Sequence, residues 1–289
     1  MRYIDNFAFG MDPNIYPGNQ LLEKISMNPV TLGRGVLAQC NKLKFVDWGN
    51  RLQRIGSQCF QGCTELEAVD LPLSLDSIFG SAFHSCSKLE SISNLENVRF
   101  ISSYAFYKCE SLKNVTIGCE VIGNDAFNSC TGLANVTLKD GVRIIGGGVF
   151  SYGVPLTSIT IPQSVDSIGY LAFPIESLFE IKVYAQKPPV MGASYNAKVF
   201  SNYDARLYVP SGTLDAYKNA LEWKRFKYIE EMDNIDGIHN SSQDSIIIDT
   251  FYDIQGHKRK VPNKGINVIR KTNGEVRKVL YSESKGLVF

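Results

Sequence analysis

The stretch "LTSITIPQSVDSIGYLAF" at residues 156–173 contains both halves of a unit that recurs along the chain. Its first half, LTSITI, alternates polar and apolar residues and is rich in β-branched side chains, which favours a short strand. Its second half holds a proline and an Ile-Gly pair among polar residues, which favours a tight return of the chain. The unit ends on Ala172-Phe173.

The same unit recurs at a nearly constant spacing. Most intervals between its phenylalanine-type positions are 23 residues, and a single coil of this size cannot bury its own apolar face. We therefore expect stacked coils whose parallel strands lie about 4.8 Å apart. The phenylalanine-type positions are Phe9, Leu37, Phe60, Phe83, Phe106, Phe127, Phe150 and Phe173. The repeat leucines, six residues later, are Leu43, Leu66, Leu89, Leu112, Leu133 and Leu156.

This unit resembles the leucine-rich repeat of the BspA-like surface proteins of Bacteroidetes. The resemblance covers about residues 1–182 and departs from the pattern at Leu37, at Gly153 and in an insertion after Phe9. It implies an α/β-type repeat fold, a leucine-rich-repeat solenoid with short parallel strands. The chain starts in mid-repeat, so we expect a truncated N-terminus and a signal peptide that has been removed.

Residues 183–232 are predicted to form a C-terminal cap with a short helix, because the last coil would otherwise expose an apolar edge. Ser211 or Thr213 is expected to cap this helix, with Leu214, Tyr217 and Leu221 on one face. The segment resembles the cap of the same family. The matching residues are Pro188, Pro189, Val209, Pro210, Tyr217 and Trp223.

After the cap, residues 233–244 are predicted to be a polar linker and residues 245–289 a small all-β tail. Asn273-Gly274 between two alternating segments indicates a hairpin. The tail resembles the C-terminal sorting or anchoring segments of secreted Bacteroidetes proteins. From Lys258 onward it has nine Lys or Arg against two Glu, a net charge of +7.

Composition excludes several classes of protein. The chain has 289 residues, 44% of them hydrophobic and 20% charged, which is typical of a folded domain rather than a disordered one. Its net charge of +1 gives no overall attraction to nucleic acid. No apolar run reaches the roughly 18 residues that a membrane-spanning helix needs.

The chain has seven cysteines, of which five precede a repeat leucine by three residues: Cys40, Cys63, Cys86, Cys109 and Cys130. A zinc site requires four converging ligands, whereas Cys59 and Cys63 are the one close pair and no histidine accompanies them. Disulfides between neighbouring coils are within reach, but side chains in one column point the same way and the count is odd. We therefore expect buried, reduced thiols, with no metal and no cofactor.

Catalytic motifs are weak. None of the three histidines, His84, His239 and His257, neighbours a plausible nucleophile in the repeat register, so a catalytic triad has little support. Gly146–Gly148 lacks the Lys-Ser/Thr of a phosphate loop and predicts a tight turn instead. The sequence therefore predicts a protein that is not an enzyme.

The remaining candidate is the face of the stacked strands. If the repeat leucine and the third and fifth residues after it point inward, the second and fourth point outward onto a concave strand face. This pattern predicts either a solvated β surface or a recognition surface. The candidate ligand-binding residues are Phe45, Asp47, Asp70, Ser91, Ser93, Asn114, Thr116, Asn135, Thr137, Ser158 and Thr160.

From the resemblance and this face, we expect a secreted or cell-surface, adhesin-like binding protein. Its partner would be a host extracellular protein or glycan, not nucleic acid, and the chain would be a monomer without a membrane span. Two alternatives remain open: a structural spacer that displays another module, and an enzyme with a site where the solenoid meets the cap.

Overall fold

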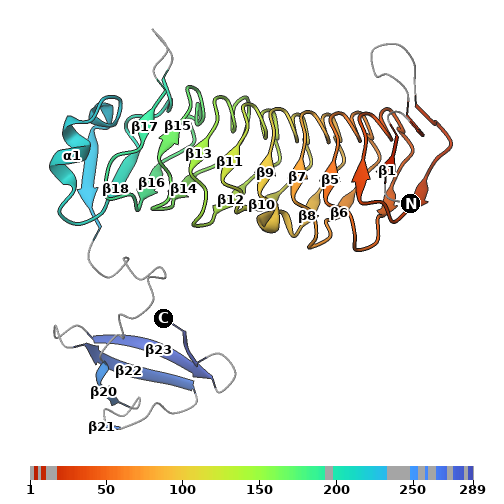
Figure 1. Cartoon of the computed structure of the whole chain (residues 1–289). Helices are drawn as coiled ribbons and strands as arrows, with labels where there is room; N and C mark the ends of the chain where they lie inside the picture. Colours follow the sequence, from red (N-terminus) through yellow and green to blue (C-terminus); the bar gives the residue numbers. More distant parts are fainter. Residues whose placement is uncertain are drawn as a thin grey trace. The chain divides into compact units, whose positions relative to one another are not determined.

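The computed structural model describes residues 3–5, 8–10, 18–192 and 198–232, and the backbone of five strands between residues 248 and 288. The chain divides into two compact units, Met1–Gly237 and Ile238–Phe289. In the first unit the chain winds into a stack of coils, as Figure 1 shows. The expected solenoid with short parallel strands is confirmed.

One side of the stack is a nine-stranded parallel sheet of two-residue strands, in the order β1-β3-β5-β7-β9-β11-β13-β15-β17. An isoleucine, leucine or methionine occupies the second position of each strand and is buried, so these residues form an inner column. The strands are β1 (Tyr3–Ile4), β3 (Thr31–Leu32), β5 (Arg54–Ile55), β7 (Ser77–Ile78), β9 (Phe100–Ile101), β11 (Val121–Ile122), β13 (Ile144–Ile145), β15 (Ser167–Ile168) and β17 (Val190–Met191).

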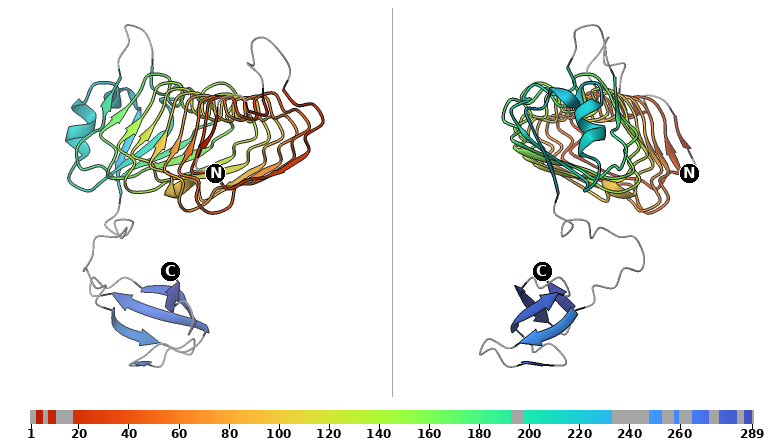
Figure 2. Two further views of the ribbon diagram at one scale, coloured as in Figure 1. Left: turned by 45° about the vertical axis from the view of Figure 1, so that its right-hand side comes forward. Right: turned by 90° about the vertical axis from the view of Figure 1, so that its left-hand side faces the viewer.

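A second side carries longer strands, also parallel, in the groups β2-β4, β6-β8, β10-β12 and β14-β16-β18-β19. Turns connect the two sides in every coil, and the coils overlie one another in both views of Figure 2. The strands are β2 (Lys24–Ser26), β4 (Phe45–Asp47), β6 (Ala68–Asp70), β8 (Ser91–Ser93), β10 (Asn114–Ile117), β12 (Asn135–Leu138), β14 (Ser158–Ile161), β16 (Glu180–Val183), β18 (Arg206–Val209) and β19 (Tyr228–Glu231). A 3-10 helix, η1 (Leu95–Asn97), follows β8.

Phenylalanines form a continuous column inside the stack. Neighbouring rings are nearly parallel, with centroids 5.0 Å apart for Phe60 and Phe83 and 5.3 Å apart for Phe173 and Phe200, an offset-stacked geometry. The column therefore extends to Phe200, one position beyond the register that the sequence predicts. Phe9 differs from the expected buried member, because it lies on the terminal coil and its side chain is 42% exposed.

Each coil turns sharply around its phenylalanine. The residues two before and two after it have left-handed backbone conformations in most coils, for example Ser81 (φ 58°) and Ser85 (φ 59°) around Phe83. Non-glycine residues occupy most of these positions at a steric cost that the stacking of the coils offsets. We call the side of the stack formed by these loops the turn side.

All seven cysteines are buried and free. In five coils the Sγ donates a hydrogen bond to the carbonyl of the phenylalanine-type residue in the preceding coil, for example at 3.2 Å from Cys86 to Phe60 and 3.1 Å from Cys130 to Phe106. Burial raises the pKa of Cys119 and of Cys130 to about 12. The thiols thus satisfy buried carbonyl groups as neutral donors.

The end of the solenoid is closed by α1 (Leu214–Asn219) and by the 3-10 helix η2 (Trp223–Arg225). Tyr217 and Trp223 are fully buried, as expected. The Tyr217 hydroxyl donates to the Ala185 carbonyl at 2.7 Å, and the Trp223 indole donates to the Pro189 carbonyl at 2.8 Å. These bonds tie the cap to the segment around β17.

Two expectations for α1 are wrong. Thr213 precedes the helix, but its hydroxyl donates to the Pro210 carbonyl at 2.7 Å instead of capping. The Glu231 carboxylate of β19 accepts the backbone N–H of Gly212 (2.9 Å) and of Leu214 (3.3 Å) in its place. Leu221 is 64% exposed because α1 ends at Asn219, so Leu221 does not continue the buried face.

The second unit is a five-stranded antiparallel sheet in the order β21-β20-β22-β23-β24. Strands β22 and β23 pair antiparallel, as a hairpin requires, although Asn273-Gly274 and the expected linker at 233–244 lie outside the described residues. The strands are β20 (Ile248–Tyr252), β21 (Lys258–Arg259), β22 (Gly265–Lys271), β23 (Val276–Ser282) and β24 (Gly286–Val288).

Candidate functional site

The candidate binding surface, which we call the strand face, is the outward side of the longer strands β2, β4, β6, β8, β10, β12, β14, β16, β18 and β19. All eleven candidate residues lie on its strands β4 to β14, at the outward positions, and ten of them are exposed while Thr116 is half-buried. Phe45 is the aromatic side chain among them and is 58% exposed. Trp48, three residues further on, points inward against Phe60, with ring centroids 5.7 Å apart.

The first part of the strand face is acidic and held by hydrogen bonds between coils. Ser26 Oγ donates to Asp47 Oδ2 at 3.0 Å, and Ser93 Oγ donates to Asp70 Oδ1 at 2.6 Å. The backbone N–H of Gly49 and then the Ser26 hydroxyl lower the pKa of Asp47, because both stabilise its charged form. Both carboxylates are therefore held in a defined orientation on an exposed surface.

The middle of the strand face consists of hydroxyl and amide groups in register. Asn114 pairs with Asn135 and Thr116 with Thr137 across β10 and β12, and Asn135 Nδ2 donates to Asn114 Oδ1 at 2.7 Å. Repetition of one residue type at one position of successive coils brings these groups together. They form a flat polar ladder of donors and acceptors.

The last part of the strand face was not expected from the repeat register. Arg206 of β18 and Glu230 form an ion pair at 3.3 Å, and Arg206 lies in register with Glu180 of the preceding strand. Tyr228 is also exposed here. The strand-like sequence "ARLYVP" could have indicated these residues. Its apolar residues Leu207 and Val209 are buried, so Arg206 and Tyr208 lie on the outward side of the strand.

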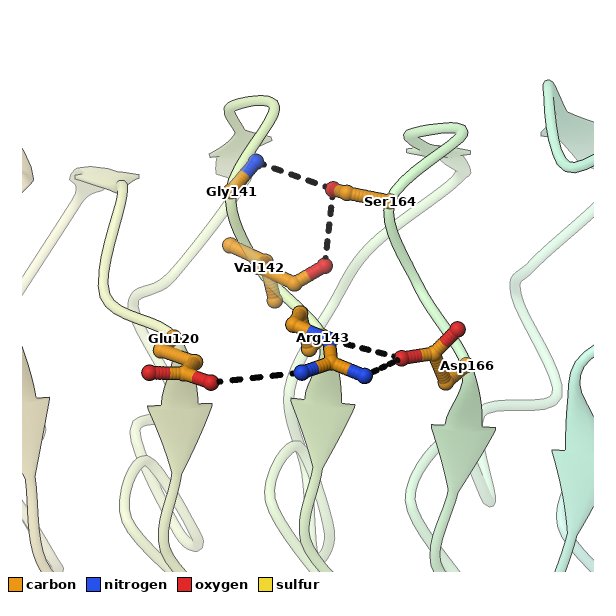
Figure 3. A network of polar contacts seen from close by, with 6 residues as sticks. All are labelled: Glu120, Gly141, Val142, Arg143, Ser164 and Asp166. Carbon is orange, nitrogen blue, oxygen red and sulfur yellow. Dashed lines mark hydrogen bonds and ion pairs between the residues drawn. The ribbon is translucent and has the colours of Figure 1, made fainter.

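The side of the stack with the two-residue strands carries paired charges instead. Arg143 bonds Asp166 of the next coil at 2.6 Å and Glu120 of the preceding coil at 3.5 Å, as Figure 3 shows. Ser164 in the same region accepts the Gly141 N–H at 2.9 Å and donates to the Val142 carbonyl at 2.8 Å. Exposed ion pairs of this kind contribute little to the free energy of unfolding. Their main effect is to hold neighbouring coils in register.

Catalytic or metal-binding geometry is weak in the described part of the chain. His84 Nδ1 lies 2.9 Å from Ser85 Oγ. The imidazole stacks on Tyr107, with ring centroids 4.8 Å apart, whereas the histidine of a catalytic triad is oriented by a hydrogen bond to a carboxylate. Burial and then the Lys108 charge lower the pKa of His84. Among the described residues, His, Cys, Asp and Glu form no group of three or more suited to a metal ion.

The described residues also contain no helix with the length and apolar composition to cross a bilayer. His239 and His257 lie outside the described residues. The three candidate types of site are a catalytic site, a metal site and a binding surface. Of these, the strand face is the one that extends over many coils of the described residues.

The chain is similar to several leucine-rich repeat proteins of known structure. Crystal structures with similar folds include a leucine-rich repeat protein of T. pallidum (30% identity, 53% of this chain and 72% of that chain covered, TM-score 0.44). They also include a leucine-rich repeat protein of Bacteroides ovatus (18% identity, 81% and 76% covered, TM-score 0.36). A third is a leucine rich cell surface protein of Faecalibacterium prausnitzii (17% identity, 82% and 84% covered, TM-score 0.40). No curated protein matches the chain.

Family membership follows from the repeats themselves. Six copies of the BspA type Leucine rich repeat region match residues 18–121 and 114–204. These matches cover more than half of the chain and end within the segment between β17 and β18. The chain therefore belongs to the BspA-type leucine-rich repeat family.

Proposed function

We propose that this protein is a non-catalytic, adhesin-like binding protein whose strand face recognises a host extracellular protein or glycan. The observation that carries the proposal is the strand face itself: exposed polar side chains at two fixed positions of successive parallel strands. Hydrogen bonds between coils preorient several of them, which lowers the entropy lost on binding.

The size of the strand face suits a protein or an extended glycan. Ten strands at about 4.8 Å give a surface roughly 40 Å long, which a protein or an extended glycan can follow. Solenoids commonly use such extended surfaces for binding rather than catalysis. Asp47 and Asp70 make its first strands acidic, whereas Arg206 at the far end is paired with Glu230, so a basic group of a partner would be oriented toward the first strands.

A secreted or cell-surface location is part of the proposal. It rests on membership of the BspA-type family and on the resemblance of residues 245–289 to sorting or anchoring segments. The protein would act as a monomer and would not bind nucleic acid, since its net charge is +1.

A structural spacer is the second candidate function. The paired charges of Arg143, Glu120 and Asp166 favour it, because they align coils without offering unpaired groups to a partner. A spacer needs only length and rigidity. Its strand face would tolerate substitutions without loss of function.

The test measures binding to arrays of extracellular-matrix proteins and glycans. Thr137→Arg places a bulky charge in the middle of the strand face, whereas Ile144→Arg places the same group at an exposed strand position on the other side of the stack. We expect a ligand that wild type and Ile144→Arg bind alike and that Thr137→Arg binds at least about tenfold more weakly, a change of 1.4 kcal/mol. Equal binding by both variants, or no ligand on either array, would favour the spacer.

A further inference from the structure

A second polar and aromatic surface lies on the turn side of the stack, away from the strand face. Tyr104 and Tyr107 flank Phe106, Asp125 precedes Phe127 by two residues, and Tyr170 precedes Phe173 by three. Tyr104 is 43% exposed and Tyr170 is 50% exposed. We call Tyr104, Tyr107, Asp125 and Tyr170 the tyrosine surface.

The glycine triplet Gly146–Gly148 lies in the coil between Asp125 and Tyr170. A side chain on Gly147 would begin 3.1 Å from the Tyr170 ring, and one on Gly148 would clash with Asp125 Oδ1. The ring and the carboxylate therefore lie over this bare backbone from the two neighbouring coils. Besides forming a turn, the glycines leave room for both groups beside the backbone.

Tyr104 and Tyr107 extend the same surface across the coils on the other side of Asp125. The nearby charge of Asp125 is the main cause that raises the pKa of Tyr104. Tyr104 and Tyr107 meet edge to face with centroids 5.7 Å apart. Asn128 Nδ2 donates to Asp125 Oδ1 at 2.7 Å and fixes the carboxylate.

This combination matches the chemistry of a sugar. The face of an aromatic ring carries partial negative charge and attracts the weakly positive C–H groups of a pyranose. A carboxylate has about four acceptor positions, so Asp125 keeps capacity for sugar hydroxyls after its bond to Asn128. Charge-assisted hydrogen bonds of this kind are stronger than neutral ones.

Other ligands fit less well. The Asp125 carboxylate repels phosphate and sulfate groups at short range, which disfavours nucleic acid and sulfated chains. Protein partners usually place an anchor side chain in a desolvated pocket, whereas the Tyr170 ring is half exposed beside Gly147. We propose that the tyrosine surface is a second binding site, separate from the strand face, and that it binds an uncharged carbohydrate with a pyranose ring stacked on Tyr170 and hydroxyls bound by Asp125.

The experiment screens the full chain on an array of microbial and mammalian oligosaccharides and then titrates the bound oligosaccharide, free in solution, by calorimetry. Tyr170→Ala and Asp125→Asn are each expected to weaken binding about tenfold, and Tyr170→Phe to retain it because the ring stays. Gly147→Ala displaces the ring without removing it and is expected to weaken binding too. Tyr152→Ala is the matched control, because Tyr152 is a 73% exposed tyrosine on the turn side outside the tyrosine surface.

Three outcomes would overturn the proposal. The first is that no oligosaccharide binds at about 1 mM, the weakest affinity useful to a single site. The second is that matrix proteins, and no oligosaccharides, bind in a manner that requires Tyr170. The third is that binding is lost in Thr137→Arg and kept in Tyr170→Ala, which would place the sugar on the strand face and support the proposed function alone. Unchanged thermal melts show that each variant is folded.

Discussion

At the scale of single residues, the coils contain left-handed backbone conformations, which cost free energy, and buried neutral thiols, which donate hydrogen bonds. Left-handed residues flank the column phenylalanines, and glycine takes such positions in some coils, as at Gly62 (φ 76°) and Gly148 (φ 66°). Elsewhere a serine, lysine or tyrosine takes the same position. The stack tolerates these residues because backbone bonds to neighbouring coils hold each loop on both sides.

Replacing a serine by glycine should have opposite effects at two nearby positions. Ser81 has a φ of 58°, so Ser81→Gly removes a strain of about 1–2 kcal/mol and is expected to leave stability equal or higher after the entropy cost of glycine. Ser103→Gly, outside the left-handed region, should lower stability by about 0.5–1 kcal/mol. Urea unfolding of both variants measures the difference, and a larger loss at Ser81 than at Ser103 would contradict the account of strain.

The buried thiols predict a loss of stability at alkaline pH. Below pH 9 a thiol is neutral in both the folded and the unfolded chain and contributes no pH dependence. Above 9.0, its ordinary pKa, Cys130 loses its proton only in the unfolded chain, because burial raises its folded pKa to about 12. Unfolding then releases protons, and stability falls by about 1.4 kcal/mol per pH unit for each such thiol until the folded pKa is reached.

Chemical unfolding at pH 8, 9 and 10 tests this slope. Wild type should lose stability between pH 9 and 10. Cys130→Ala, although less stable at pH 8, should lose less over this interval by the contribution of one thiol, roughly 1 kcal/mol, because the unfolded thiol is already half ionised at pH 9. Equal slopes in the two proteins would show that Cys130 does not remain protonated in the folded chain.

At the scale of elements, the cap ends the stack by covering the last aromatic of the column. Trp223 lies 5.9 Å from Phe200 between ring centroids and 5.2 Å from Tyr217. The parallel sheet also continues through β18 and β19, whose pairing ends on Glu231. The same residue caps α1, so the last strand and the cap helix are stabilised together.

Truncating the cap tryptophan should destabilise the end of the solenoid first. Trp223→Ala removes a fully buried side chain and is expected to cost about 3–5 kcal/mol. In a nearly one-dimensional array, hydrogen exchange should accelerate in β16, β18 and β19 before it does in β5 and β7. Phe179→Ala removes an exposed aromatic and should change stability by less than about 0.5 kcal/mol. Uniform acceleration along all coils would contradict local opening.

At the scale of the whole molecule, two units with different architectures share one chain. The solenoid unit extends to Gly237, and the tail sheet belongs to the unit from Ile238 onward. The first is a parallel stack in which each coil contacts its neighbours, and the second is an open antiparallel sheet of five strands. Domains with separate cores are expected to unfold separately.

Deleting residues 245–289 should therefore leave the melting transition of the solenoid almost unchanged. The measurement compares thermal melts of the full chain, the deletion and Trp223→Ala. A deletion that lowers the melting temperature more than Trp223→Ala does would make the tail part of the solenoid core and would shift the domain boundary.

The sequence by itself determined the contacts that repeat every 23 residues. Residues one period apart occupy the same position in neighbouring coils, so the parallel strands, the stacked phenylalanines and the aligned thiols such as Cys86 follow from spacing alone. The outward positions of the strand face follow as well, since Ser91 and Ser93 alternate around a strand residue that packs on the core. A repeated unit makes long-range contacts predictable because they recur at fixed separation.

Only the tertiary structure decided the contacts between residues that do not follow the 23-residue repeat. Glu231 replaces Thr213 as the cap of α1, and Phe200 joins the column although it lies outside the 23-residue register read from the sequence. Asp125 and Tyr170 both lie against the Gly147–Gly148 backbone, although they come from the coils on either side of it. Such contacts depend on how side chains of different coils lean toward one another, and this is set by packing in three dimensions rather than by spacing along the chain.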